Sequence, residues 1–291
     1  MSEQVAKRTT VERVAELAMR LGGKHLADYG SARSRHDFTQ RQLMACLILR
    51  AYLKTTYRGV LELLAVSPKL REALGMPDKL PHYTTLQKFS ARSQVLVIAD
   101  AMIRTIGRAA GEPQFAKTSA AMDATGMETT TASAHFQSRA GRTRCKWVKV
   151  STIVWCGSLL PLSLVLGWGP GNDKCQAKEL MSKASEATLP AKLYADAGYD
   201  AEWVPDQCRL DWGAESIIKP ARQRADGTRS GCWRSRMSEQ HLKRKGYGSR
   251  WAGESFFSGL KRTMGSTLTS RTPGQLLAEA AFKVLAYTLR R

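Results

Sequence analysis

Residues 244–262 read RKGYGSRWAGESFFSGLKR, a run of cations and aromatic residues that contains a single carboxylate, Glu254. On a helix that advances about 100° per residue, Tyr247, Arg250 and Glu254 would share a stripe roughly 60° wide. Lys261 would continue the same stripe two turns further along the helix. The spacing therefore predicts a helix that presents a phenol, two cations and one acid on a single face.

The neighbouring face of this helix is apolar, which favours packing on a core. Four residues form that face: Phe256, Phe257, Leu260 and Met264. An alternative interpretation is a surface helix in which Glu254 only balances the nearby cations Arg250 and Arg262. The rest of the sequence has to distinguish these two interpretations.

The charge of the chain favours a polyanionic partner. Its 291 residues include 45 Lys and Arg against 25 Asp and Glu, which gives a formal net charge of +20. The excess of cations is spread over both halves of the chain. Such a distribution indicates a long polyanion such as a nucleic acid, with an anionic membrane as the other candidate surface.

Cysteine and histidine usage indicates neither a disulfide framework nor a zinc site. The six cysteines form no C-x-x-C pair, and the five histidines are dispersed. The first residues, MSEQVAKRTT, lack the apolar segment of a signal peptide. We therefore expect a reduced, cytoplasmic protein.

Residues 1–115 carry the signals of several short helices. Thr39 opens a T-x-x-Q capping box that leads into QRQLMACLILRAYL, and Ser67 with Pro68 opens another helix that Gly75 ends. Short helices with an excess of positive charge are compatible with a DNA-binding module of the helix-turn-helix type. A plain helical bundle with a solvated basic face explains the same residues.

Residues 116–291 read as a mixed α/β domain. The predicted order is three strands, a helix, a strand, a helix or loop, a strand and a helix, with a basic loop over residues 219–250. The uncharged run 150–172, VSTIVWCGSLLPLSLVLGWGPGN, is long enough to span a bilayer. Because Gly157 and Ser158 divide it into two β-rich halves, it is better interpreted as a buried hairpin at the centre of a sheet.

Acidic residues follow the predicted strands of this domain. Asp123 and Asp196 are each expected at a strand end, where open α/β sheets place functional groups, although Asp is also a common turn residue. Asp173 also follows a strand and competes with Asp196, whereas Asp200 is expected to cap a helix. Together with Glu254, such carboxylates would suit Mg²⁺ and phosphoryl chemistry on a nucleic acid backbone.

These residues resemble those of bacterial insertion-sequence transposases of the DDE type, whose catalytic domain has a ribonuclease-H-like fold. The stretch 244–262 matches all four positions of the family's Tyr-x2-Arg-x3-Glu-x6-Lys signature. AMDATG and YADAGYD resemble the motifs that carry the family's two aspartates. The resemblance implies that Asp123, Asp196 and Glu254 are the catalytic, metal-binding acids. Asp196 is preferred to Asp173 because YADAGYD is the closer match and its strand is expected to lie beside the strand that holds Asp123.

The resemblance also implies the fold and the domains. We expect a ribonuclease-H-like DDE catalytic domain over residues 116–291, preceded by an all-helical DNA-binding region over residues 1–115. The implied reaction is DNA cutting at transposon ends followed by joining of the 3′ ends to target DNA, with two Mg²⁺ or Mn²⁺ ions per site. A homodimer bound to two DNA ends, in the cytoplasm of a bacterium and associated with its nucleoid, is the expected working state.

Several residues are expected to bind DNA. Tyr247, Arg250 and Lys261 would hold the phosphate backbone beside the cut. Trp251, about 40° round the helix, would either stack on an unpaired base or pack as a core aromatic. The basic runs 135–149 and 220–236 would follow phosphates, or else be solvated loops.

Two functions of other classes remain open at this stage. One is a transposase-derived DNA-binding protein without activity, which the intact acids argue against. The other is a basic membrane protein that spans once through residues 150–172.

Overall fold

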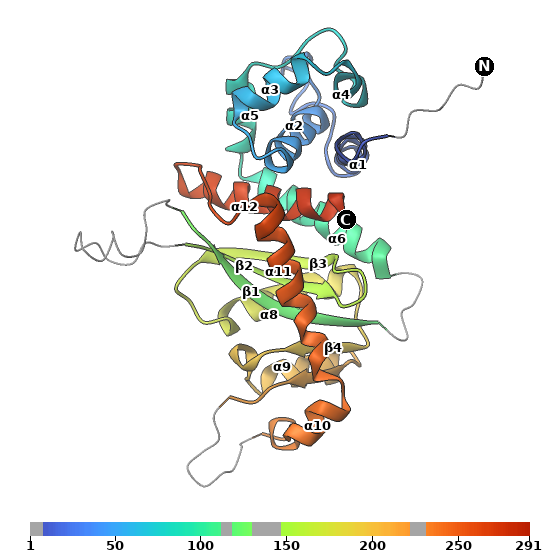
Figure 1. Ribbon diagram of the computed structural model, residues 1–291, viewed down its shortest axis with the longest axis vertical. Helices are drawn as coiled ribbons and strands as arrows, with labels where there is room; N and C mark the ends of the chain where they lie inside the picture. Colours follow the sequence, from blue (N-terminus) through green and yellow to red (C-terminus); the bar gives the residue numbers. More distant parts are fainter. Residues whose placement is uncertain (1–7, 112–117, 130–146, 222–230) are drawn as a thin grey trace, which may run out of the picture. The chain divides into compact units, whose positions relative to one another are not determined.

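The computed structural model describes residues 8–111, 118–129, 147–221 and 231–291 (Figure 1). Two compact units make up the chain. Unit 1 comprises Met1–Met102, Thr263–Gly265 and Ser270–Arg291, and unit 2 comprises Ile103–Arg262 and Ser266–Thr269. Each unit is described by itself below.

The described residues of unit 1 form helices joined by loops, without a strand. Its helices are α1 (Thr10–His25), α2 (Gln40–Tyr52), α3 (Tyr57–Ala65), α4 (Pro68–Ala73), α5 (Tyr83–Ser90), the first half of α6 (Gln94–Gly111) and α12 (Pro273–Arg290). The capping box expected at Thr39 is present, because its hydroxyl accepts from the amide of Gln42 and the Gln42 side chain accepts from the amide of Thr39. The all-helical character of this region is thereby confirmed.

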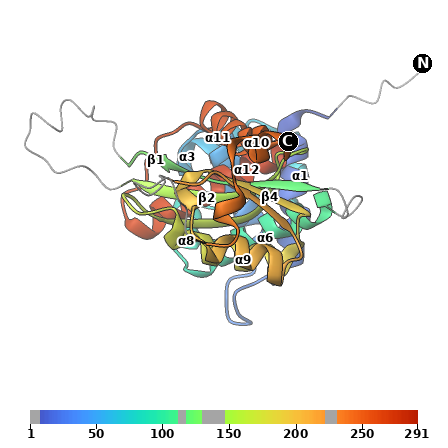
Figure 2. The same ribbon diagram turned by 90° about the horizontal axis from the view of Figure 1, so that it is seen from below.

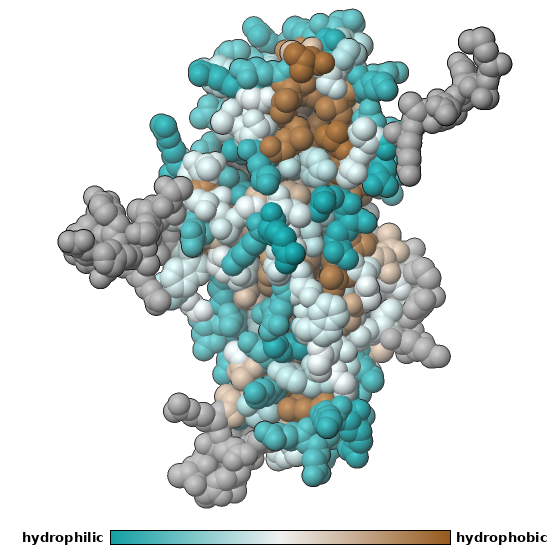
Figure 3. All heavy atoms as spheres, viewed as in Figure 1, coloured by the Kyte–Doolittle hydropathy of each residue, from teal (hydrophilic) through white to brown (hydrophobic). Residues whose placement is uncertain are grey.

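The core of unit 1 lies around α2. Every residue from Leu43 to Ala51 of that helix is buried, and α2 packs against both α1 and α12. Figure 3 shows an apolar patch on one face of these helices, and on α3 the side chain of Leu63 is exposed. The sequence analysis assigned α12 to the catalytic domain, whereas its contacts place it in unit 1. The division into a DNA-binding region and a catalytic domain stays a prediction.

Among the described residues of unit 2, five strands form one mixed sheet in the order β3-β2-β1-β4-β5. The strands are β1 (Ser119–Met127), β2 (Val148–Trp155), β3 (Pro161–Trp168), β4 (Lys192–Ala195) and β5 (Glu215–Ile218). The first three pair antiparallel, and β4 and β5 run parallel to β1. The strand order along the chain and the mixed α/β class are as expected for a ribonuclease-H-like catalytic domain.

The uncharged run 150–172 forms most of the β2–β3 hairpin. Val150 pairs with Leu166 and Thr152 with Leu164, and every residue of β2 is buried. The hairpin is therefore confirmed, but its expected place at the centre of the sheet is wrong, because β3 is an edge strand. The single-span interpretation is also wrong, because this segment is not a helix. No helix in the described part of the chain is long and apolar enough to cross a membrane.

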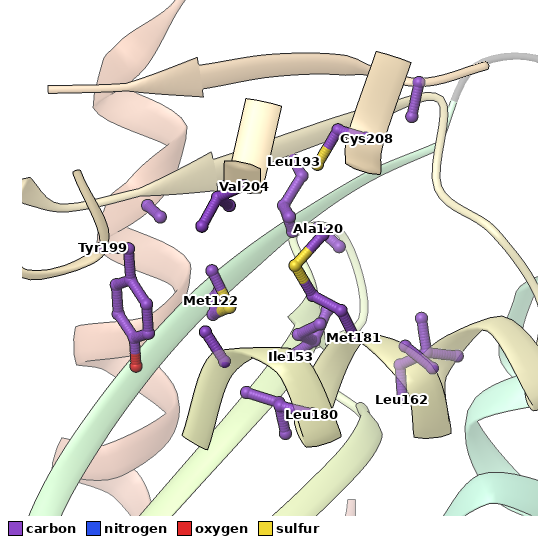
Figure 4. Packing of buried hydrophobic residues seen from close by; sticks show 14 of the residues in the cluster. Ala120, Met122, Ile153, Leu162, Leu180, Met181, Leu193, Tyr199, Val204 and Cys208 are labelled. Atoms are coloured by element: carbon purple, nitrogen blue, oxygen red, sulfur yellow. The ribbon is translucent and has the colours of Figure 1, made fainter. Parts of the chain in front are cut away.

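Helices cover both faces of the sheet. Helices α8 (Lys174–Ala187) and α9 (Trp203–Asp206) lie on one face, and α11 (Trp251–Met264) crosses the other (Figures 1 and 2). Between the sheet and α8, side chains such as Met122, Leu193 and Met181 gather in a buried cluster (Figure 4). Burial of these apolar groups is the main stabilising term of this layer. The cluster holds β1 and β4 in fixed register.

Two sequence-based expectations differ from the structure. First, β1 does not end at Asp123 but continues to Met127, because its second half still pairs with β2. Second, residues 219–250 are not loop throughout. Outside residues 222–230, which the structure does not describe, they contain 3-10 turns at Arg234–Arg236 and Tyr247–Arg250 and the short helix α10 (Glu239–Arg244).

Candidate active site

The two aspartates lie side by side on neighbouring parallel strands. The last register pair of β1 and β4 joins Met122 to Ala195, and Asp123 and Asp196 are the next residues on each strand. Asp123 itself pairs with Thr152 of β2. On its other side it has no partner in β4, because the pairing of β1 with β4 ends at Met122. The sequence analysis expected these two strands to be neighbours, and that is confirmed.

The carboxylate of Asp196 is held by the turn that follows β4. Its Oδ1 accepts a hydrogen bond of 2.8 Å from the amide of Gly198, in the 3-10 turn Ala197–Tyr199. This is the geometry of a capping aspartate, which leaves the second carboxylate oxygen available for another ligand. The turn therefore fixes the direction in which Asp196 faces.

Glu254 reaches the site because α11 crosses β1 at a glycine. A Cβ atom on Gly253 would lie 2.6 Å from the Cβ of Asp123 and 3.0 Å from its Oδ2, distances that no side chain tolerates. Glycine at this position lets the helix approach the strand closely. Glu254, the next residue, is thereby brought near enough for its charge to act on Asp123.

The three acids interact electrostatically. Burial raises the pKa of Asp123 to about 6; a hydrogen bond from the amide of Ala124 opposes this shift, and the charges of Asp196 and Glu254 add to it. The positive charge of Arg250 lowers the same pKa. The structure thus brings the three predicted acids to one place and makes the ionised form of Asp123 unfavourable there.

Arg250 and Tyr247 line the same site. They lie in the 3-10 turn Tyr247–Arg250 rather than on α11 itself, so the expected single helix stripe is interrupted. Arg250 Nη2 donates to Glu254 Oε1 at 2.7 Å, and its guanidinium lies 5.9 Å from the ring centre of Tyr247. Burial raises the pKa of Tyr247, and the charges of Asp196 and Glu254 raise it further. Arg250 is therefore the cation that faces the acids directly.

The donor set fits a hard divalent cation. Within the described ranges, no three His, Cys, Asp or Glu side chains are arranged to hold a metal ion together. The carboxylate of Glu254 is paired with Arg250 instead. The residue types nevertheless suit such an ion, because carboxylate oxygens are the ligands that Mg²⁺ and Mn²⁺ prefer.

Asp173, the competing acid, is already paired. Its Oδ1 lies 2.5 Å from the ammonium of Lys149, a β2 residue whose side chain is 7% exposed. A Cβ atom on Gly198 would lie 2.8 Å from its Oδ2 and 2.9 Å from Asp196 Oδ1, so the two carboxylates are near neighbours. Burial raises the pKa of Tyr199, and the charges of Asp173, Asp123 and Asp196 raise it further, so Asp173 belongs to the surroundings of the site.

The remaining predicted DNA-binding residues are accessible in part. Trp251 is 57% exposed, so its interpretation as a core aromatic is wrong. Lys261 is partly exposed two turns beyond Glu254, and the apolar residues Phe256 and Leu260 are buried as expected. The basic runs 135–149 and 220–236 fall largely or partly outside the described residues.

Comparison with known families decides the family. The sequence profile described as "Transposase DDE domain" matches residues 115–289, which is more than half of the chain. The chain belongs to this family. The Tyr-Arg-Glu-Lys signature and a bacterial insertion-sequence origin remain predictions for this transposase.

Other comparisons add little. No curated protein matches the transposase. Among solved structures, a match is the piggyBac transposase in a cryo-EM structure of its synaptic complex with hairpin DNA, at 11% identity, over 96% of this chain and 71% of that one, with a TM-score of 0.43. A likeness at this TM-score supports no conclusion about the present chain.

Sequence reasoning missed two residues that shape the site. One is Gly253, since a glycine directly before Glu254 is a signal of close approach between a helix and its neighbour. Lys149 is a lone cation in the apolar strand VKVSTIVW, and a charge in a buried strand indicates a specific partner. Both signals were present in the sequence.

Proposed function

We propose that this transposase binds the ends of a mobile DNA element, cuts the DNA there and joins the 3′ ends to target DNA. Asp123, Asp196 and Glu254 are the proposed catalytic acids, and together they would hold two Mg²⁺ or Mn²⁺ ions. The observation that carries this proposal is the position of Asp123 and Asp196, which directly follow the last register pair of the parallel strands β1 and β4, within residues 115–289 that match the transposase DDE profile.

The residues of the chain have separate tasks in this reaction. When bound, the ions activate water or a 3′-hydroxyl and stabilise the leaving oxygen. Asp123 and Asp196 are held by β1 and by the turn after β4, so they are oriented before any ligand arrives. Arg250 neutralises Glu254 in the free protein and would exchange that carboxylate for a phosphate oxygen of DNA.

The proposed DNA contacts are made by side chains of the turn Tyr247–Arg250 and of α11, next to the acids. Tyr247, Arg250 and Lys261 would bind the backbone next to the cut, and exposed Trp251 is suited to stack on an unpaired base. The basic helical region 1–115 would recognise the end sequence. A homodimer that joins two DNA ends, working on the DNA of a bacterial cell, completes the proposal.

The test is cleavage of a plasmid that carries the element with its flanking DNA. Glu254→Gln should abolish cutting in Mg²⁺ and in Mn²⁺ while the protein still retards DNA in a gel, because phosphate contacts do not need this carboxylate. A chelator should stop the wild type in the same way. Normal cutting by Glu254→Gln, or cutting in excess chelator, would refute the proposal. Binding without cutting by the wild type would favour the inactive DNA-binding alternative.

Lys261 supplies a second readout that separates DNA contact from metal binding. Lys261 lies roughly 10 Å along α11 from Glu254, too far to share an ion with it. Lys261→Ala should leave Mn²⁺ binding unchanged and lower the slope of log affinity for DNA against log salt by about one unit. An unchanged salt slope would remove Lys261 from the interface.

A further inference from the structure

A buried lysine stands beside the proposed active site. The ammonium of Lys149 lies 2.5 Å from Asp173 Oδ1 and donates a 2.7 Å hydrogen bond to the carbonyl of Gly171. With its side chain only 7% exposed, Lys149 has little access to water. A buried cation of this kind depends on its counterion, because an unpaired charge in such a place is strongly destabilising.

The carboxylate of Asp173 is paired with Lys149 and also lies next to Gly198, in the turn that follows Asp196. A Cβ atom on Gly198 would lie 2.8 Å from Asp173 Oδ2 and 2.9 Å from Asp196 Oδ1, so the two carboxylates flank one glycine. Asp173 stands at the N-terminus of α8 but makes no capping hydrogen bond with its side chain. Its carboxylate is directed to Lys149 instead of to its own helix.

The two flanking acids differ in what neutralises them. Asp173 has the ammonium of Lys149, whereas Asp196 forms no salt bridge with any residue that the structure describes and accepts only the amide of Gly198. A divalent cation gains most from a carboxylate that carries an uncompensated charge. Binding at Asp173 would in addition leave the buried ammonium of Lys149 without its counterion.

We propose that Lys149 decides which aspartate serves as the second metal ligand. Lys149 holds Asp173 as its own counterion, and the ion therefore goes to Asp196. This inference rests on the proposed function, since it concerns the same metal site. Lys149 is a specificity-determining residue and touches neither metal nor DNA.

The test is calorimetric titration of Mn²⁺ alone into the full chain, without DNA. Asp196→Asn should weaken Mn²⁺ binding at least about tenfold, and Asp173→Asn in the wild-type background less than about threefold. Lys149→Met combined with Asp196→Asn should recover most of the lost affinity, because Asp173 is then released as a ligand. Adding Asp173→Asn to that pair should remove the recovery.

A matched control keeps the result specific. Lys183→Met also deletes a lysine of unit 2, one whose salt bridge is to Glu179 on the same helix, and it should recover nothing when combined with Asp196→Asn. Thermal melting followed by circular dichroism reports whether each variant is folded. Lys149→Gln, which can still donate to the carbonyl of Gly171, replaces Lys149→Met if the latter does not fold.

The outcomes separate this inference from the proposed function. If Asp123→Asn and Asp196→Asn both weaken Mn²⁺ binding but no folded Lys149 variant restores it, only the role of Lys149 is wrong. Equal losses for Asp173→Asn and Asp196→Asn also overturn that role, because both acids would then bind the ion. If neither Asp123→Asn nor Asp196→Asn changes Mn²⁺ binding, the proposed function itself fails and the inference with it.

Discussion

Two carboxylates of unit 2, the buried Asp200 and the partly buried Asp123, have opposite surroundings. The side chain of Asp200 is 2% exposed, and its oxygens accept from Arg234 Nε at 2.6 Å, from Arg234 Nη2 at 2.7 Å and from the amide of Ala221 at 2.7 Å. Asp123 accepts a hydrogen bond from the amide next to it and faces two more acids.

The pKa values follow these surroundings. Burial raises the pKa of Asp200, but the hydrogen bonds from Arg234 and Ala221 outweigh it, so the pKa lies below its usual value. At Asp123 burial and the neighbouring acids prevail, and the pKa rises to about 6. A buried acid with its own cation stabilises the fold, whereas one left without enough positive charge is suited to bind a cation from outside.

The largest expected difference between the two acids is in catalysis. Asp123→Asn should lower plasmid cleavage by about 10³-fold or more, because a metal ligand is lost while the shape is kept. Asp200→Asn should retain cleavage within about tenfold when assayed below its melting temperature. The comparison would be wrong if the two variants lost activity equally while both were folded.

The free energy of unfolding should show the reverse order, with a larger loss for Asp200→Asn than for Asp123→Asn. Asp200→Asn leaves Arg234 without its carboxylate and should lower the free energy of unfolding by about 3 kcal/mol, measured by denaturant titration. Asp206→Asn is the matched control, since an amide oxygen still accepts from Trp233 Nε1 as the carboxylate does at 2.8 Å. If Asp206→Asn lowered the free energy of unfolding as much as Asp200→Asn does, the ion pair of Asp200 with Arg234 would not be the cause of the loss.

Helix α11 offers a geometric test of the Asp123 site. In Gly253→Ala the new methyl group would lie 2.6 Å from Asp123 Cβ, so α11 should move away from β1. Cleavage should fall about 10- to 100-fold, because this movement misaligns Glu254 with Asp123. Gly248→Ala is the matched control, since a Cβ there meets nothing within 4 Å. Equal activity of the two alanine variants would show that the close approach of α11 does not matter.

The smallest expected effect is on stability against pH. Because the pKa of Asp123 rises from 3.8 to about 6 on folding, its contribution to stability is favourable at low pH and is lost as the pH rises from about 4 to about 6. With chelator present, Asp123→Asn should therefore melt about 2–4 °C above the wild type at pH 8 and show no such gain near pH 4. Asp200→Asn should instead melt below the wild type at pH 8. If Asp200→Asn melted above the wild type at pH 8, the stabilising role given to the Asp200 carboxylate would be wrong.

Local patterns in the sequence predicted much of this structure. The capping box at Thr39, the hairpin over residues 150–172 and the apolar face of α11 each depend on neighbouring residues, and each was found as expected. The contact of Arg250 with Glu254 is the one that the alternative surface-helix interpretation expected, although Arg250 lies in the 3-10 turn before α11. Such patterns can be recognised in a single sequence because the repeat of the helix or strand sets the spacing of residues that share a face.

Long-range pairing was not readable in the same way. Asp200 was expected to cap a helix, yet it binds Arg234 across 34 residues of sequence, and the N-cap of α9 is Glu202. The end of β1 was misplaced at Asp123 because β4 stops pairing there while β2 continues. Such partners are set by the tertiary fold, which local propensity does not contain.

The central claim is that Asp123 binds a catalytic metal ion, and Asp123→Cys tests it most directly. A thiolate is a poor ligand for Mg²⁺ and a better one for Mn²⁺. We expect Asp123→Cys to cut the plasmid at least about tenfold faster in Mn²⁺ than in Mg²⁺, beyond any ratio shown by the wild type, and Asp123→Asn to show no such preference. Equal cutting by Asp123→Cys in both metals, at a rate near that of the wild type, would contradict it.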